Sequence, residues 1–314
     1  EYLGAVLPAA RKLLTQASVQ SSAVQRLVLP TNWRYALSRA NVISQSIERE
    51  WGIDARLADL PKAPAWSANA TTAETGKRFR FKQTTCGDYE LGYADAAEFK
   101  VADAMAVSAA FPIGIGPLAL RTADYVWHKR DTWGGKPEDA QRITPPYKHI
   151  HLYDGGLYDN LGVEPLFDMS AGSFREGVDY IIVSDAGAPL KRTSPKSVLN
   201  PFRAKRLIDI TMEQVRSLRV RSLVSFLLDQ RGRGIYVQMG VEAQKHITKF
   251  QEQNPAVAKE LLEQEWLDAN EVQRAAAHPT NLRAFKPEQF DRLVTHGYQT
   301  VKCNELMFQQ ATTH

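Results

Sequence analysis

Several features that mark other protein classes are missing from this 314-residue sequence. It has only two cysteines, Cys86 and Cys303, too few for a disulfide framework. That number fits a reducing compartment or a secreted protein without bridges. There is no repeat of fixed period and no low-complexity tract, which excludes repeat architectures and fibrous proteins. With 44% hydrophobic and 24% charged residues, the chain is a globular protein able to bury a large core.

The sequence also lacks a large charge excess and an unbroken hydrophobic span. A formal net charge of +4 is small for this length, so we expect no nucleic-acid partner. The longest uncharged run, residues 104–120, contains four helix breakers: Pro112, Gly114, Gly116 and Pro117. We therefore expect a buried helix that runs into a loop, not a transmembrane segment.

The first residues contain neither an initiator Met nor the pattern of a signal peptide, so the chain reads as though it starts within a longer protein. The compartment stays open, and the expected locations are the cytoplasm or the periphery of a membrane.

Apolar periodicity predicts both helices and strands in the first third of the chain. Residues 38–52 have the three- and four-residue spacing of a helix that ends at Gly52. Residues 64–72 and 78–86 are rich in β-branched or aromatic residues and predict two neighbouring strands, with a turn at Thr75-Gly76. These elements indicate an α/β protein.

Two further strands are predicted at residues 147–154 and 178–187, and a helix between them at residues 160–174. This order of strand, helix and strand is the crossover of a parallel sheet. The run Ile181–Ser184 is apolar on both parities, as expected for a central strand covered on both faces. The sequence therefore predicts a parallel sheet with helices around it.

The last third of the sequence is mainly helical. Helical patterns and one short strand are predicted at residues 201–230, 234–240, 257–277 and 287–306. No stretch is rich enough in Pro, Gly or Ser to mark a clear linker, and residues 193–202 are the best candidate. We expect a core at residues 1–200 and a helical extension at residues 201–314.

Asp154 is the residue that most invites a functional interpretation. It stands in the stretch YDGGLYDNLGVEPL, residues 153–166, at the end of a predicted strand. Open α/β sheets place their ligands at such strand ends. Gly155 and Gly156 permit positive φ and a close approach of backbone or substrate. An ordinary turn is the alternative interpretation of the same triplet.

Five blocks of the chain, in the same order, resemble those of patatin-like phospholipases. They are residues 66–81, 102–112, 153–166, 178–189 and 281–298. The resemblance implies a three-layer α/β/α sandwich around a mainly parallel sheet, with a helical C-terminal part. It also implies that Asp154 is the base of a Ser-Asp dyad, supported by the turn at Gly155 and Gly156. The implied reaction is hydrolysis of a lipid ester through an acyl-enzyme, without a metal or organic cofactor.

The family's nucleophile does not match any residue here. In the family it is the Ser of a Gly-x-Ser-x-Gly elbow, preceded by a glycine-rich oxyanion loop. The nearest approach is Ser170, which has Asp168 in place of the first glycine and follows Asp154. We expect the nucleophile on a segment before Glu1, which would leave the core incomplete and this chain inactive by itself. The alternative is that this chain is a non-catalytic scaffold, which binds either lipid or a partner chain that carries the nucleophile.

A metal site is a third interpretation. His149 and His151 alternate onto one face of the predicted strand, and a His-x-His pair followed by Asp often begins a metal site. Parity places Asp154 on the other face, and no other histidine forms a paired motif. Packed or hydrogen-bonded strand histidines explain the same pattern, and we expect no metal.

Two surface regions combine features of membrane contact. Residues 121–147 contain basic residues and four aromatic ones: Tyr125, Trp127, Trp133 and Tyr147. The helical segment carries a second basic concentration: Arg203, Lys205, Arg206, Arg216, Arg219 and Arg221. Such residues suit the peripheral surface of an anionic membrane or an acidic partner. A self-packed loop and a solvated helix face are the alternatives.

Overall fold

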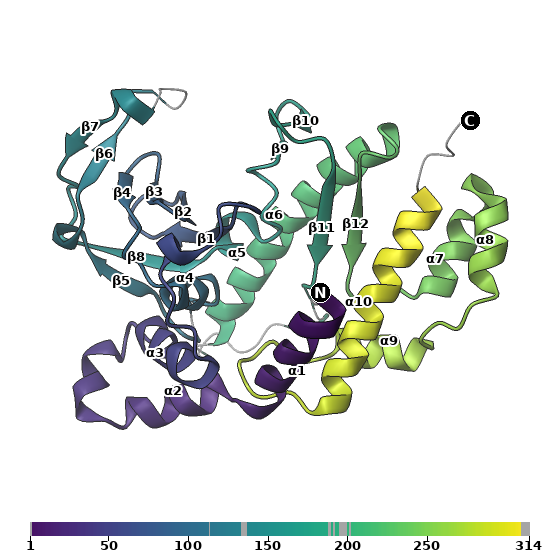
Figure 1. The fold of residues 1–314 in the computed structure, drawn as a ribbon, viewed down its shortest axis with the longest axis horizontal. Helices are drawn as coiled ribbons and strands as arrows, with labels where there is room; N and C mark the ends of the chain where they lie inside the picture. Colours follow the sequence, from purple (N-terminus) through teal and green to yellow (C-terminus); the bar gives the residue numbers. More distant parts are fainter. Residues whose placement is uncertain are drawn as a thin grey trace. The chain divides into compact units, whose positions relative to one another are not determined.

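The structure is a computed structural model that describes residues 2–112, 114–132, 137–187, 190, 192–194, 200 and 202–308 (Figure 1). The chain divides into two compact units, each described by itself below. The sheet unit is Gln16–Gly162 with Leu282–Ala284. The helical unit is Glu1–Thr15, Val163–Asn281 and Phe285–His314. The domain division that we expected at residue 200 stays a prediction.

An eight-stranded sheet forms the centre of the sheet unit, in the order β5-β8-β1-β2-β3-β4-β6-β7 (Figure 1). The strands are β1 Ser67–Thr72, β2 Arg78–Lys82, β3 Thr85–Asp88, β4 Gly92–Asp95, β5 Leu118–Arg121, β6 Trp127–Lys129, β7 Gln141–Ile143 and β8 His149–Asp154. Every neighbouring pair in it is antiparallel. The expected sandwich around a mainly parallel sheet is therefore wrong.

Side-chain alternation explains why this sheet is antiparallel and one-sided. In β2, Phe79 and Phe81 are fully buried, whereas the residues between and beside them are not. In β8, Ile150 and Leu152 are buried in the same way. Strict alternation is typical of antiparallel sheets that place one face on the core, whereas a parallel sheet covered on both faces needs apolar residues on both parities.

Helices cover one part of this sheet. They are α2 Val19–Leu27, α3 Ala40–Trp51, α4 Val101–Ser108 and the single turn α5 Gly156–Asp159, with short 3₁₀ turns η2 Pro30–Tyr35, η3 Leu57–Asp59, η4 Thr122–Asp124 and η5 Pro137–Asp139. The apolar helix α4 packs against β1, β8 and β5, and α3 packs between α4 and α2. The expected helix ending at Gly52 is confirmed, because Gly52 adopts a left-handed φ of 64°. The expected β1–β2 pair and its turn are confirmed as well.

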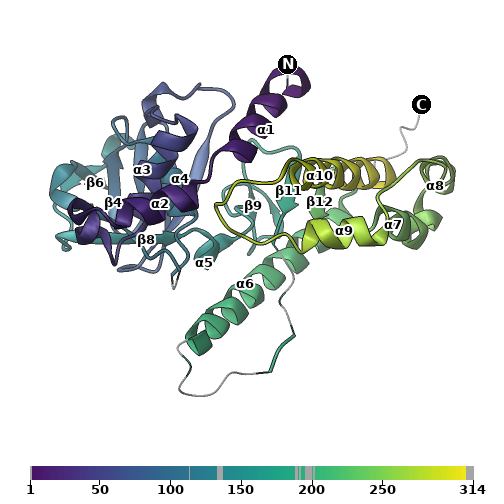
Figure 2. The ribbon, with the colours of Figure 1, turned by 90° about the horizontal axis from the view of Figure 1, so that it is seen from below.

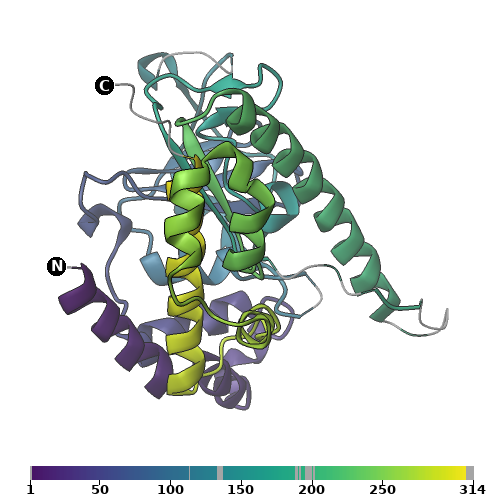
Figure 3. The same cartoon turned by 90° about the vertical axis from the view of Figure 1, so that its right-hand side faces the viewer.

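The helical unit combines long helices with two small strand pairs. Its helices are η1 Tyr2–Val6, α1 Leu7–Gln16, α6 Phe202–Asp229, α7 Ala243–Phe250, η6 Gln251–Gln253, α8 Pro255–Leu262, α9 Ala269–Ala276 and α10 Pro287–Phe308. Its strands are β9 Phe167–Asp168, β10 Ser173–Phe174, β11 Ile181–Asp185 and β12 Gly234–Gln238. Figure 2 shows α6 as one long helix, and Figure 3 shows α10 lying along the β11/β12 pair, in agreement with its packing on β12.

The one parallel pair in the described part of the chain is β11 with β12, and α6 connects them. The predicted crossover from residues 147–154 to 178–187 is therefore wrong, since β8 and β11 belong to different sheets. Residues 160–174, predicted as a helix, form turns and the β9/β10 hairpin instead. Ile182 is 61% exposed, so β11 is not covered on both faces.

In the run at residues 104–120, the expected helix is the second half of α4, which ends at Ser108, and β5 begins at Leu118; residue 113 between them lies outside the described residues. Among the residues that the structure describes, no helix is both long enough and apolar enough to cross a bilayer.

Candidate catalytic carboxylate

Asp154 is the last residue of β8, and its backbone is held from two sides. It pairs with Ala70 of β1, and the Thr71 hydroxyl donates to its carbonyl oxygen at 2.9 Å. Its N–H donates to the carbonyl of Ala110, just beyond α4, at 3.1 Å. Because β1, β8 and the end of α4 all belong to the packed core, the side chain leaves the sheet from a rigid position.

A tight turn follows at once and holds the carboxylate. The N–H of Gly156 donates to Asp154 Oδ1 at 2.7 Å. Two reasons for glycine were expected here, a positive φ and a close approach of backbone. Gly155 has a φ of −61° and neither glycine has a positive φ, so the first reason does not apply. Space is the reason for Gly155: a Cβ there would lie 2.6 Å from the backbone oxygen of Asn69.

The environment of the carboxyl favours its neutral form. Burial raises the pKa of Asp154 to about 6, against the opposing effect of the Gly156 N–H, which stabilises the charge. Oδ2 accepts no hydrogen bond from any residue that the structure describes. A carboxylate with a raised pKa and one unengaged oxygen is a stronger base than an exposed Asp, yet it is mostly ionised at neutral pH.

Asn69 is a second polar residue at this turn, and we did not predict it as part of a site. It lies in β1 next to Ala70, and its Oδ1 is buried without a hydrogen-bond partner among the described residues. An orphaned buried acceptor is costly unless a ligand or water supplies a donor. The available signal was an Asn in the interior of a strand, a position where Asn is depleted.

Asp159 is a second carboxyl close to the turn after Asp154. It is the last residue of α5. It is buried, and its Oδ1 accepts from the N–H of Gly162 at 3.1 Å. Its contacts are those of a residue that stabilises the turn after Asp154.

The two strand histidines occupy the solvent-facing side of β8. His149 is exposed, whereas His151 Nδ1 lies 2.7 Å from Glu74 Oε1 and its N–H donates to Glu74 Oε2. This contact agrees with the interpretation of hydrogen-bonded strand histidines. Within the described ranges, no group of three His, Cys, Asp or Glu side chains is arranged to hold a metal ion.

Neither Ser170 nor the two cysteines have the environment of a catalytic nucleophile. Ser170 lies in the exposed turn between β9 and β10, where its hydroxyl donates to Asp168 Oδ1 at 2.7 Å. That turn joins two strands, so it is not a strand-to-helix elbow. Cys86 and Cys303 are both buried, and burial raises the pKa of each thiol to about 12. A thiolate is therefore disfavoured at either position.

The two regions considered for membrane contact are largely engaged within the protein. Trp127 is buried and donates from Nε1 to the carbonyl of Thr122, whereas Tyr147 is partly exposed. Trp133 lies outside the described residues. On α6, Arg216 is buried in ion pairs with Asp185 and Glu213, so this position is not part of a solvated basic face.

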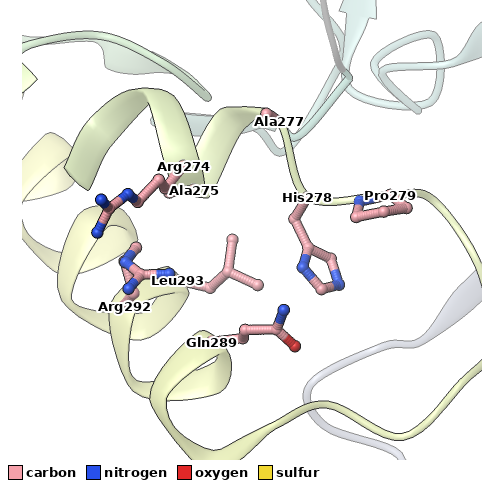
Figure 4. A pocket seen from close by; sticks show the side chains of 8 residues that line it. All are labelled: Arg274, Ala275, Ala277, His278, Pro279, Gln289, Arg292 and Leu293. Carbon is pink, nitrogen blue, oxygen red and sulfur yellow. The ribbon is translucent and has the colours of Figure 1, made fainter. Parts of the chain in front are cut away.

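A cavity of about 260 Å³ lies in the helical unit, between α9 and α10 (Figure 4). It is lined by Arg274, Ala275, Ala277, His278, Pro279, Gln289, Arg292 and Leu293. Glu271 accepts from Arg274 at 3.1 Å and from Arg292 at 2.6 Å, which neutralises part of their charge. The cavity contains no residue of the sheet unit, and its charges are engaged internally.

Comparisons with known proteins do not assign the chain to a family. No family model, no curated protein and no solved structure matches it. The likeness to patatin-like phospholipases therefore rests on the five sequence blocks alone.

Proposed function

We propose that Asp154 is the general base of a serine-dependent lipid acyl hydrolase of the patatin-like type, whose serine lies outside these 314 residues. The observation that carries the proposal is the carboxyl itself: it is held by a rigid turn, its pKa is raised to about 6, and Oδ2 is unengaged by the described residues. The serine and the lipid ester come from the sequence resemblance.

The reaction needs one proton acceptor in each of two steps. Asp154 Oδ2 takes the proton of the serine hydroxyl while the serine oxygen attacks the ester carbonyl carbon. The tetrahedral intermediate collapses, the alcohol leaves with the proton from Asp154, and the acyl group stays on the serine. Asp154 then takes a proton from water as the water oxygen attacks the acyl carbonyl. Collapse releases the fatty acid and returns that proton to the serine.

The rigid turn supports this role in a specific way. The hydrogen bond from the Gly156 N–H to Oδ1 restricts rotation of the carboxylate. Oδ2 is therefore held in one orientation, in which it can accept the proton of a serine hydroxyl. Asn69 adds a buried acceptor at the same turn for a donor on the substrate or on an ordered water. The proposal places the activity in the cytoplasm or at a membrane periphery.

The test uses a longer polypeptide that contains this chain and a Gly-x-Ser-x-Gly segment. Asp154→Asn should lower ester turnover by about 100-fold or more, because it keeps the turn but removes the base. Asp159→Asn is the matched control, since it changes a neighbouring carboxyl that contacts the turn and not the reacting oxygen; its effect should fall on the thermal midpoint. Near-normal turnover of folded Asp154→Asn would remove the base assignment.

A non-catalytic scaffold is the second candidate, and one observation favours it. No two glycines in the chain are separated by three residues, so a Gly-x-Ser-x-Gly motif is absent throughout. Labelling of the longer polypeptide, or of a co-purifying chain, with an active-serine phosphonate separates the two functions. Labelling that inhibits ester hydrolysis supports the hydrolase, and an unlabelled complex without hydrolysis supports the scaffold.

A further inference from the structure

An exposed apolar segment in the sheet unit is not used by the proposed chemistry. It spans residues 24–37, from the second half of α2 through η2, and we call it the α2–η2 segment. Its large exposed apolar side chains are Val24, Val28, Leu29, Trp33 and Leu37. Leu37 is 85% exposed, Val28 73% and Trp33 64%, so they gain almost nothing from the core. Single exposed apolar residues are common, but five within fourteen residues mark an interaction surface.

Inward-facing residues anchor the segment to the sheet unit. Leu27 and Tyr35 face inward and pack against the cluster formed by α2, α3 and α4. Asn32 is buried, and its side chain donates to the carbonyl of Arg26 at 3.0 Å, which ties η2 back to α2. Leu27 and Tyr35 therefore occupy the inward positions, and Trp33 and Leu37 are left exposed on the outside.

Along the sequence, the charged residues in and beside the segment have a single sign. Residues 16–47, which belong to the sheet unit, contain three Arg and no Lys, Asp or Glu. Arg34 and Arg39 are exposed, and neither forms an ion pair with a described residue; Arg34 lies over the Tyr35 ring at 4.6 Å. This pattern of Trp and Leu with unpaired Arg side chains, without carboxylates, complements an anionic bilayer. Apolar side chains enter the interface, Trp prefers headgroup depth, and Arg meets phosphate.

We propose that the α2–η2 segment is a docking surface for anionic membranes, with Trp33 and Leu37 entering the interface and Arg34 and Arg39 meeting lipid phosphates. The surface lies outside both regions first considered for membrane contact. It involves neither Asp154 nor ester hydrolysis, so it stands or fails separately from the proposed function.

Co-sedimentation with vesicles tests this surface on the chain itself. Vesicles of phosphatidylcholine with phosphatidylserine should pellet the protein, and pure phosphatidylcholine should bind it more weakly. Trp33→Ser should reduce the partition coefficient by about tenfold, through loss of a large apolar side chain. Arg34→Gln should reduce it by about fivefold, which corresponds to roughly 1 kcal/mol per basic residue near an anionic surface. Added salt should weaken binding of the wild type.

Tyr298→Ser is the matched control, because Tyr298 on α10 is 65% exposed, close to the value for Trp33. It should bind like the wild type, and Leu37→Ser repeats the test if Trp33→Ser does not fold. Three results would overturn the proposal: no pelleting with anionic vesicles, equal losses for Trp33→Ser and Tyr298→Ser, or binding that is indifferent to lipid charge. Self-association or capture of an acidic protein through Trp33, without vesicle binding, would overturn it as well.

Discussion

Replacing Asp154 by Asn should stabilise the sheet unit at neutral pH while it removes the proposed base. In the folded chain, burial raises the pKa of this carboxyl from 3.8 to about 6. The folded state therefore binds the proton more tightly than the unfolded state does. The resulting stability is fully present below about pH 4 and is lost as the pH rises through about 6. Above that pH, Asp154 is ionised in the folded protein, and its buried charge lowers the unfolding free energy.

The size of that cost follows from the change in proton affinity. At 1.36 kcal/mol for each factor of ten, a pKa change from 3.8 to about 6 corresponds to about 3 kcal/mol. The side chain is partly exposed, which reduces the effect to roughly 1–2 kcal/mol. Asn keeps an acceptor for the Gly156 N–H, and its NH₂ replaces an oxygen that has no partner among the described residues.

Urea unfolding between about pH 4 and pH 8 measures the prediction, with wild type and variant compared at each pH. The difference in unfolding free energy should be near zero at the acid end and should favour Asp154→Asn at neutral pH. Asp124→Asn is the control of opposite sign, because the side-chain hydrogen bond from Arg121 lowers the pKa of Asp124. Loss of stability in Asp154→Asn at neutral pH, or a difference that does not vary with pH, would refute the assignment of a buried carboxylate whose charge is disfavoured by desolvation.

Gly155→Ala should lower the unfolding free energy by about 1–3 kcal/mol, since its Cβ would lie 2.6 Å from the backbone of β1. Gly297→Ala, at an exposed position of α10 where a Cβ meets no atom within 4 Å, should instead raise the unfolding free energy by up to about 1 kcal/mol, and urea midpoints of both variants give the comparison. His296 is buried, accepts from the Gly240 N–H at 3.0 Å through Nε2, and has a pKa lowered by burial. Neutral His296 therefore contributes to folding stability above about pH 6.5, and this contribution is lost as the pH falls. The Gly240 amide should lose protection from hydrogen exchange in acid, and unchanged protection would contradict this contact. The chain by itself should hydrolyse a short-chain p-nitrophenyl ester no faster than background, and turnover blocked by an active-serine phosphonate would show that the nucleophile is present after all.

Local elements were predictable because their signals are local. The helix at α3 ends where Gly52 offers a left-handed C-cap, and the β1–β2 hairpin turns at Gly76. Helix breakers stop α4 before it can become a membrane span. Each of these outcomes depends on residues within a few positions of one another, so sequence spacing contains the necessary information.

Strand pairing was not predictable in the same way. The predicted partner of β8 was β11, because a short run of apolar residues and an apparent helix lay between them. The actual partners of β8 are β1 and β5. Strand β11 instead pairs with β12, and the long helix α6 connects these two strands along the chain. Pairing depends on which edges and faces remain to be covered once the core forms, and this is a property of the whole unit.

For the candidate site, the sequence by itself determined the identity of Asp154, its place at a strand end and the glycine that follows it. Only the tertiary structure decided that Gly155 is required for space and not for positive φ, and that Asn69 from β1 lies against the turn. The raised pKa of Asp154 is likewise a tertiary property, because desolvation comes from segments far apart in the chain that pack around one carboxyl.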